Sequence, residues 1–406
     1  MTPTPGPPAN AVPTAMCPRC AATVPQGAFC GSCGAELGRV RQGWLAAARL
    51  GVFAVAPRER VLVPMVTSTL FPHLPQTYRN PFRIGMFMML GGVVVLSALR
   101  LLGPLVTLVA LGVPVLFVLY LWQSSLLRDI PNHALAIAAG LGGALGASWV
   151  LVTGGLVARA YGIPIAAGFV LETVVGVGLF VSVGGALLMV VPAMVVRLLR
   201  PPVRESLDGF VIGAIGALSF AGAATTTRLA PQFVVGLIQK VPPMRLFVEA
   251  ILYGVTVPLT AASVGGLIGI LLWFRPGTRA GERSGRVRVA LVSFGALVTA
   301  IYVATWVIEA ARLPKWPQLG LHILVTMVAL LAARVCIQLA LLHEEPDPGT
   351  GQPVLCVRCD RVVPDMAFCP ACGAATRAAS RTSRRQRREA PPTRRGPDGE
   401  SHVYCE

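Results

Sequence analysis

The sequence predicts an all-α polytopic membrane protein of about eight transmembrane helices, flanked by two small β-rich modules built around cysteines. Three observations predict this fold class. The 406 residues are 54% hydrophobic and only 13% charged, about half the charged share of a soluble protein. The charged residues crowd the two ends and leave a long apolar middle. Two similar groups of four cysteines stand outside that middle, one near each end.

The first residues, 1–14, have neither a charged start nor an apolar run, so we expect a disordered lead-in and not a signal peptide. The net charge of +17 comes almost wholly from arginine, since lysine occurs only at Lys240 and Lys315. This bias, with the excess of Ala, Gly and Val, is typical of a GC-rich bacterial genome.

Residues 15–38 contain two C-x-x-C turns, Cys17 to Cys20 and Cys30 to Cys33. Each turn directs two thiolates at one point, and Gly34 permits the tight bend after the second turn. Four thiolates form a closed, structural zinc site, and a loop this short needs the metal for its folding. Disulfides or redox-active cysteines are the alternative. The spacing favours zinc, and the stretch resembles the zinc-ribbon family.

Residues 355–375 repeat this pattern with the same spacing. Val-Pro and Ala-Phe pairs also recur at matching places, and we expect Phe29 and Phe368 each to pack on its own knuckle. The sequence therefore predicts two structural Zn²⁺ ions, with these ligands: Cys17, Cys20, Cys30, Cys33, Cys356, Cys359, Cys369 and Cys372. Cys336 lies in a predicted span as a packing residue, and Cys405 is expected to be a free thiol.

A basic linker, 39–83, leads to the membrane. Within it the apolar stretch 43–55 is too short to span, and we expect an interfacial helix with Trp44 and Phe53 in the headgroup layer. His73 is either a metal ligand or a histidine in a turn near the membrane surface. The second reading is favoured because no further ligand is near it in the sequence.

The transmembrane domain, 84–342, is expected to contain eight spans. Their predicted bounds are 84–102, 104–122, 133–154, 168–196, 209–227, 247–274, 287–311 and 318–342. Small residues recur at helix-packing spacing, as at Gly142 and Gly146 or at Gly209, Gly213 and Gly216. The fourth, fifth and sixth spans are rich in glycine, so we expect them to form the packed centre, with the sixth broken at Pro258.

An even number of spans places both ends on one side. The loops facing the side of the termini carry slightly more arginine than the opposite loops, and both termini are strongly basic. The positive-inside rule then predicts a multi-pass protein of the cell membrane with both termini in the cytoplasm. That compartment keeps thiols reduced, which agrees with metal-binding cysteines.

Ionisable residues inside the spans are few: Glu172, Glu249, Glu309, His322 and Arg334. A charge in hydrocarbon is costly, so each is a functional hypothesis. The four acidic and histidine residues lie near helix ends and can reach water, which favours a structural reading. Arg334 is the deepest, and we expect its side chain to snorkel to the cytoplasmic face or to pair with an acidic residue.

The fifth span begins Asp208-Gly209 and continues through Gly213, Gly216 and Ser219-Phe220-Ala221. This pattern resembles the signature helix of PrsW-type intramembrane proteases. The resemblance implies a catalytic glutamate four residues after Phe220, an asparagine after it, a Glu pair with a Lys on the preceding helix, and a later histidine. This chain has Ala224 and Thr225 at the first two places and lacks the others, so we expect a core without that catalytic set.

After a linker, 343–354, and the second ribbon, the basic tail 376–406 is expected to be disordered. Its arginines predict attraction to the anionic inner leaflet. Nucleic acid is a less favoured partner because the tail lacks aromatic residues for base stacking.

These features favour a binding or scaffold protein over an enzyme, because a closed four-cysteine site is structural and the core lacks catalytic carboxylates. The expected partner is a cytoplasmic protein bound through the ribbons. The alternatives are a divergent intramembrane protease, and a transporter or channel, which would need paired polar residues near the midplane.

Overall fold

The computed structural model describes residues 13–38, 44, 48–161, 171–203, 205–235, 242–277, 281–310, 313–345 and 353–389. The chain divides into two compact units. A helical unit covers Leu62–Glu344, and a terminal unit combines Met1–Val61 with Glu345–Glu406. The two ends of the sequence therefore belong to one unit.

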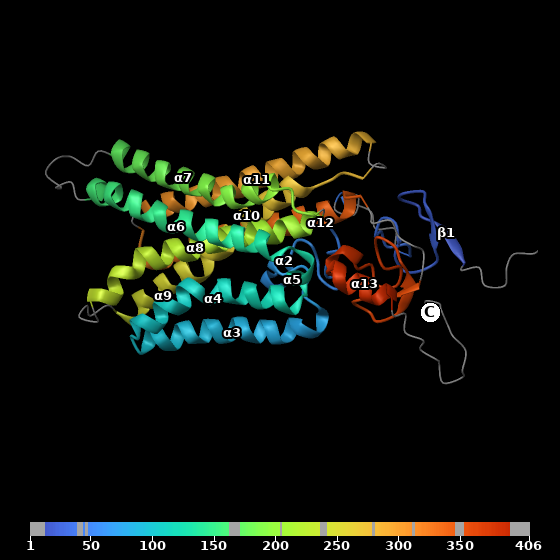
Figure 1. Cartoon of the computed structure of the whole chain (residues 1–406), viewed down its shortest axis with the longest axis horizontal. Coiled ribbons are helices and arrows are strands. Elements are labelled where there is room, and N and C mark those ends of the chain that lie inside the picture. Colours follow the sequence, from blue (N-terminus) through green and yellow to red (C-terminus); the bar gives the residue numbers. More distant parts are fainter. Residues whose placement is uncertain are drawn as a thin grey trace, which may run out of the picture. The chain divides into compact units, whose positions relative to one another are not determined.

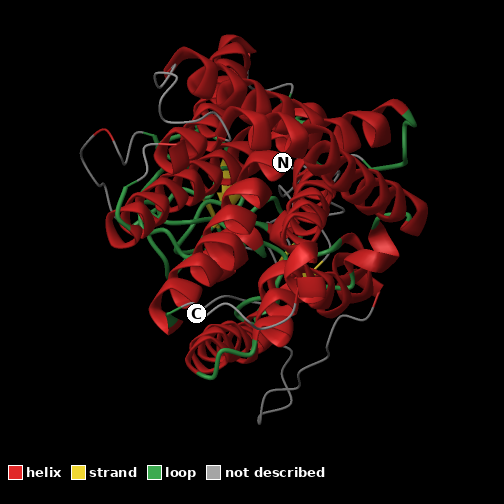
Figure 2. Ribbon diagram, turned by 90° about the vertical axis from the view of Figure 1, so that its left-hand side faces the viewer, coloured by secondary structure: helices red, strands yellow, loops and turns green. Residues whose placement is uncertain are grey.

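The helical unit is a bundle of long helices, as Figures 1 and 2 show. Their bounds are α3 (Gln76–Ala98), α4 (Leu102–Gln123), α6 (Asn132–Tyr161), α7 (Leu171–Leu198), α8 (Ser206–Val235), α9 (Pro243–Ile251), α10 (Val257–Trp273), α11 (Gly281–Ala310) and α12 (Lys315–His343). Two short helices, α2 (Val66–Leu70) and α5 (Leu126–Asp129), lie between them in sequence.

Among the described residues, eight helices are long and apolar enough to cross a membrane, which confirms the predicted fold class. The sixth is continuous from Pro243 to Trp273, and its middle, η2 (Leu252–Thr256), is a π-helix. The π-helix ends two residues before Pro258, which lacks the N–H that a regular turn would use. The first span begins at Gln76 rather than at residue 84, and it accommodates Pro81 inside the helix.

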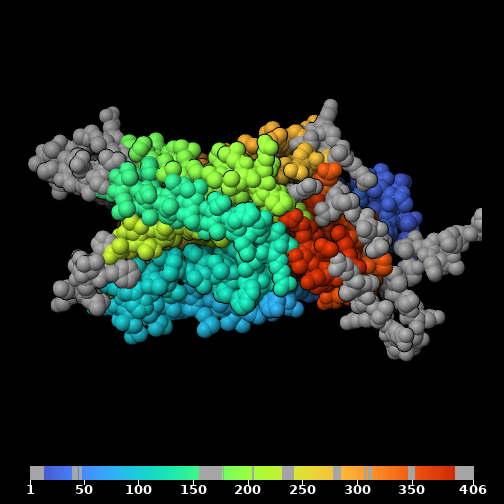
Figure 3. Space-filling view, in the orientation of Figure 1, coloured from blue at the N-terminus to red at the C-terminus, as the bar shows by residue number. Residues whose placement is uncertain are grey.

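Helix α8 forms the centre of the bundle. In its span 83% of the residues are buried, against 72% for the sixth span and 61% for α12. The fourth span, α7, is only 39% buried, so our expectation that α7 is one of the most buried spans was wrong, and α12 is buried to a greater extent. Glycine content alone did not identify the most buried spans. In Figure 3, α8 is visible as a narrow yellow strip between the cyan and green helices.

Small residues bring α8 into backbone contact with α6 and α10, as their spacing predicted. An added Cβ at Gly142 or Gly146 of α6 would overlap the carbonyl oxygens of Gly216 and Phe220. On the other side, an added Cβ at Gly213 or Gly269 would overlap the carbonyl oxygens of Gly265 and Gly209. Such close approach lets dispersion contacts act between backbones, where lipid gives no hydrophobic drive between helices.

The terminal unit contains two short antiparallel hairpins. Strands β1 (Thr14–Met16) and β2 (Thr23–Pro25) pair in the first, and β3 (Pro353–Leu355) and β4 (Val362–Pro364) pair in the second. The registers are equivalent, with Met16 opposite Thr23 and Leu355 opposite Val362. A 3₁₀ turn, η4 (Thr376–Ala378), and a helix, α13 (Arg381–Glu389), follow the second hairpin.

Two expectations about the regions beside the hairpins need correction. Phe53 is fully buried in the terminal unit and not in a headgroup layer, and the backbone N–H of Ala375 donates to the carbonyl of Ala54. Residues 48–55 form no helix, whereas most of 43–47 lies outside the described residues. The stretch 376–389 of the predicted disordered tail is ordered as η4 and α13, and the remainder, 390–406 with Cys405, also lies outside them.

Candidate metal centres

Each cysteine pair of the first ribbon is shaped by a backbone turn. Cys17 follows β1 directly, and the N–H of Ala21 donates to its carbonyl at 2.9 Å. In the second turn the N–H of Gly34 donates to the carbonyl of Cys30 at 2.8 Å. Gly34 has a φ of +69°, a left-handed conformation that glycine adopts without strain, at the tight bend that the sequence predicted.

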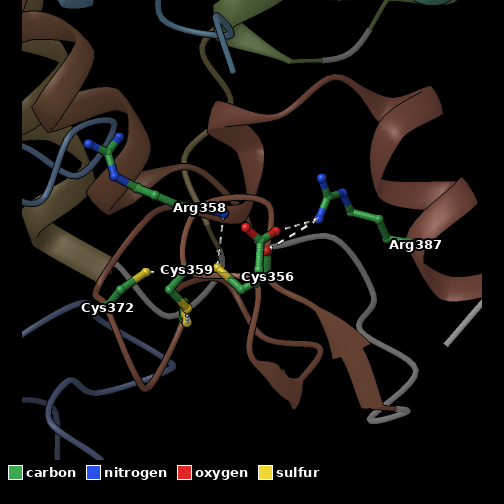
Figure 4. Close-up of polar contacts among 7 residues, drawn as sticks. Cys356, Arg358, Cys359, Cys372 and Arg387 are labelled. Carbon is green, nitrogen blue, oxygen red and sulfur yellow. Dashed lines mark hydrogen bonds and ion pairs between the residues drawn. The ribbon is translucent and has the colours of Figure 1, made fainter. Parts of the chain in front are cut away.

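The second ribbon repeats this geometry bond for bond. The N–H of Asp360 donates to the carbonyl of Cys356 at 3.1 Å, and that of Gly373 to the carbonyl of Cys369 at 2.8 Å. Gly373 has a φ of +73°. Figure 4 shows this knuckle, where the backbone N–H of Arg358 donates to Cys356 Sγ at 3.4 Å. Donation to sulfur stabilises a thiolate, as a metal ligand requires.

In both ribbons the eight predicted cysteines converge into two groups of four, within each of which all the sulfur atoms lie within 4.8 Å. The Sγ separations are 3.8 Å for Cys17–Cys33 and 3.8 Å for Cys20–Cys30. The corresponding pairs of the second ribbon are 3.8 Å for Cys356–Cys372 and 3.9 Å for Cys359–Cys369.

These distances test the fit of a metal ion. A tetrahedral ion with metal–sulfur bonds of about 2.3 Å, as in zinc sites, has sulfur–sulfur edges of about 3.8 Å. A disulfide would need about 2.05 Å. Both groups of four could therefore hold a metal ion, and the geometry is that of a closed site with four protein ligands.

The thiols perturb one another strongly when they carry protons. A hydrogen bond from Cys33 lowers the pKa of Cys30 to about 5, and the same bond together with burial raises that of Cys33. In the second ribbon the hydrogen bond with Cys359 raises the pKa of Cys356, but those with Cys369 and Cys372 outweigh it and lower that pKa to about 7. A divalent cation bound to all four sulfur atoms would replace the protons that these thiols share.

The two ribbons pack on each other through exchanged phenylalanines. An added Cβ at Gly373 would come within 2.7 Å of Phe29 Cδ1, and one at Gly34 within 2.9 Å of Phe368 Cδ1. The N–H of Phe29 donates to the carbonyl of Pro370 at 2.9 Å. Each ring therefore lies on the knuckle of the other ribbon, and our expectation that it packs on its own was wrong.

Arginines of α13 hold that helix against the second ribbon. Arg387 donates to the carbonyl of Cys356 at 3.2 Å and lies 3.9 Å from Asp360 (Figure 4). Arg388 pairs with the buried carboxylate of Asp365 at 2.5 Å, and Arg384 donates to the carbonyl of Ala379 at 2.8 Å. These contacts explain why a segment whose composition predicts disorder is folded here.

In the helical unit Arg334 does not snorkel. Its side chain is completely buried in α12, and Nη1 donates to Ser68 Oγ at 2.5 Å and to Thr69 Oγ1 at 3.4 Å. The short helix α2 thus provides hydroxyl acceptors to the guanidinium. The side chain of Cys336 is also buried in α12, in agreement with its predicted packing role.

The remaining ionisable candidates whose side chains the structure describes come from three helices, α9, α11 and α12. Glu249 pairs with Arg245 at 3.0 Å and with Lys315 at 3.6 Å. Glu309 is half-buried in α11, and His322 is buried in α12, one turn from Thr326. The side chain of Glu172 lies outside the described residues.

Sequence reasoning placed His73 in a turn but did not predict its burial, and it missed further buried polar residues at the ends of several helices. His73 is buried, and its Nδ1 lies 3.0 Å from the Tyr120 hydroxyl. The backbone N–H of Ser206 donates to Glu344 Oε1 at 2.9 Å, and Asp208 is buried beside it in sequence. In the sequence, the only indication of these buried residues is a cluster of polar residues just outside the apolar runs. Such a cluster resembles an ordinary helix cap or loop.

Comparisons with known protein families, with curated proteins and with solved structures found no match to this chain. The resemblance to PrsW-type proteases gains no support from them. The chain therefore stands as a multi-helix membrane core with two cysteine groups that could hold metal ions.

Proposed function

We propose that this protein is an integral membrane scaffold whose two zinc ribbons, both in the cytoplasm, form a docking module for a cytoplasmic protein. The observation that carries the proposal is the pair of four-cysteine groups in one terminal unit, each with two Sγ–Sγ separations of 3.8–3.9 Å. Zinc is the metal proposed because four thiolates at this spacing are typical of its structural sites.

A binding role suits closed sites better than catalysis does. Four cysteine ligands leave no coordination position for water or substrate, so the ions would stabilise the fold and not take part in chemistry. The core is proposed to be non-catalytic because α8 carries Ala224 and Thr225 where the resemblance to PrsW-type proteases requires glutamate and asparagine. The protein is accordingly not proposed as an enzyme.

The location follows from parity and charge. Eight candidate spans are an even number, and the two ends of the chain belong to one unit, so both termini are proposed to lie on one side. We propose that this side is the cytoplasm of a bacterial cell and that the core lies in the cell membrane, because an excess of arginine on that side fits the positive-inside rule. The arginines of residues 376–406 that do not hold α13 are proposed to attract anionic lipids of the inner leaflet.

Cross-linking in intact cells, followed by purification from membranes, tests the docking role. We expect one set of cytoplasmic proteins joined to residues of the terminal unit, and loss of these links when Cys30→Ser and Cys369→Ser are combined. Cys336→Ser is the matched control, because this cysteine is buried in α12 and belongs to neither group. Links that persist in the double variant, or that map to the helical unit, would refute docking by the ribbons.

A further inference from the structure

We infer that the two metal sites are coupled, so that each ribbon holds its ion tightly only when the other ribbon is folded around its own. This inference deepens the proposed function and rests on it, because it assigns a regulation to the same two sites. The residues that transmit the coupling are Phe29 and Phe368.

The first step is the exchange of side chains at the knuckles. Gly34 and Gly373 each follow the last cysteine of a ribbon and adopt a positive φ, so the bend there orients Cys33 and Cys372. The ring of Phe368 covers Gly34, and the ring of Phe29 covers Gly373. Each phenylalanine stands directly before a cysteine of its own ribbon, Cys30 or Cys369. Ordering one quartet therefore fixes the ring that covers the other.

The second step is a pair of backbone hydrogen bonds, each of which joins one ribbon to the other. The N–H of Phe29 donates to the carbonyl of Pro370, and the N–H of Phe368 donates to the carbonyl of Gly31, each at 2.9 Å. Pro370 and Gly31 lie directly after Cys369 and Cys30. If one quartet loses its metal and its turn opens, both bonds lose a partner, and the other turn is left with unsatisfied backbone groups.

The third step is the lack of an independent core in either ribbon. The buried apolar residues of the first ribbon are only Val24, Ala35 and three of its cysteines. The residues that pack against them are Cys20, Ala22, Leu37 and, from the second ribbon, Met366. Modules this small depend on the metal for folding. Since both ribbons supply part of each other's packing, metal binding to one raises the affinity of the other by the same factor.

The test is a chelator titration of the zinc-loaded, full-length protein in lipid nanodiscs, with the thiols alkylated at each step. Mass spectrometry of the peptides then reports each quartet separately. In the unaltered protein we expect both quartets to become reactive over one chelator range. Phe29→Ala should lower the chelator concentration at which half of the second quartet becomes reactive by about tenfold, and it should lower that of the first quartet by less. Phe368→Ala should affect the first quartet more than the second.

Matched controls separate coupling from general destabilisation. Val24→Ala and Val363→Ala remove buried side chains from the ribbons' own clusters, so each should affect its own quartet first. Phe29→Leu keeps an apolar side chain and should give the same crossed order with a smaller shift, even where the alanine variant folds poorly.

Three outcomes would overturn the coupling. One is that each phenylalanine variant affects its own quartet more, and another is that the two quartets of the unaltered protein open in separate ranges. In both of these the ribbons still hold metal, so the proposed docking module survives. The third is that neither quartet is ever protected by zinc, which refutes the coupling and the zinc ribbons together.

Discussion

The contacts that stabilise the inside of each unit differ in kind between the helical unit and the terminal unit. In the helical unit the closest contacts are between backbones, where glycines of α6, α8 and α10 leave room for neighbouring carbonyl groups. In the terminal unit the strands have three residues each, and the packing centres on two groups of four cysteines. One unit therefore depends on the absence of side chains at a few positions, and the packing of the other centres on cysteine groups that could each hold a metal ion.

The largest effect is expected from filling the contact between α8 and α10. Gly213→Leu would place a side chain into the backbone of α10 at Gly265, so the helices must separate. We expect the yield of monodisperse protein to fall by about an order of magnitude, as measured by size-exclusion chromatography. Gly91→Leu is the control, because an added Cβ there meets nothing within 4 Å and the yield should not change.

Removal of metal should affect only the terminal unit. A strong chelator is expected to expose all eight quartet cysteines to alkylation and to open residues 13–38 and 353–389 to proteolysis. The helical circular dichroism of the spans should persist, because the described residues contain no metal-binding group there. Loss of the span helices on chelation would show that the two units do not differ in this way.

The buried guanidinium of Arg334 sharpens the comparison within the bundle. Arg334→Met removes hydrogen bonds to Ser68 and Thr69 and should cost about 2–3 kcal/mol, seen as a lower thermal midpoint in detergent. Arg245→Met serves as the control. Its ion pair with Glu249 is exposed, so only a few tenths of a kcal/mol are expected. Equal effects of the two substitutions would contradict the structural role of Arg334.

The smallest effect is expected at α13. Arg388→Gln weakens the pairing with the buried carboxylate of Asp365, and a loss of about 1 kcal/mol should raise the cleavage rate within 381–389 severalfold. Metal content should remain unchanged. Gln386→Ala, at an exposed position of the same helix, should leave the cleavage rate nearly as it was. Unchanged protection in Arg388→Gln would show that this pair does not hold the helix.

The sequence predicted the features that depend on local patterns. Apolar runs and breaks gave the eight spans, and the spacing of Gly142 and Gly146 gave the close contact with α8. Cysteine spacing gave both quartets, and the glycine after the second turn of the first ribbon gave the tight bend at Gly34.

Features that depend on distant partners could not be predicted in this way. The repeat shows that Phe29 and Phe368 occupy equivalent positions. That equivalence holds whether each ring packs on its own ribbon or on the other ribbon, so the sequence does not distinguish the two arrangements. Burial of Arg334 depends on hydroxyl groups of α2, whose residues are far away in the sequence. The order of α13 depends on Asp365 and on a backbone carbonyl of the second ribbon, so composition alone gave the wrong answer.

The most direct test of the account is the metal content of the full-length protein, measured together with the thiol state of its cysteines. We predict two zinc ions per chain, with all eight quartet thiols reduced and protected from alkylation until a chelator is added. A protein that purifies without metal, or whose quartet cysteines are joined as disulfides, would contradict the account.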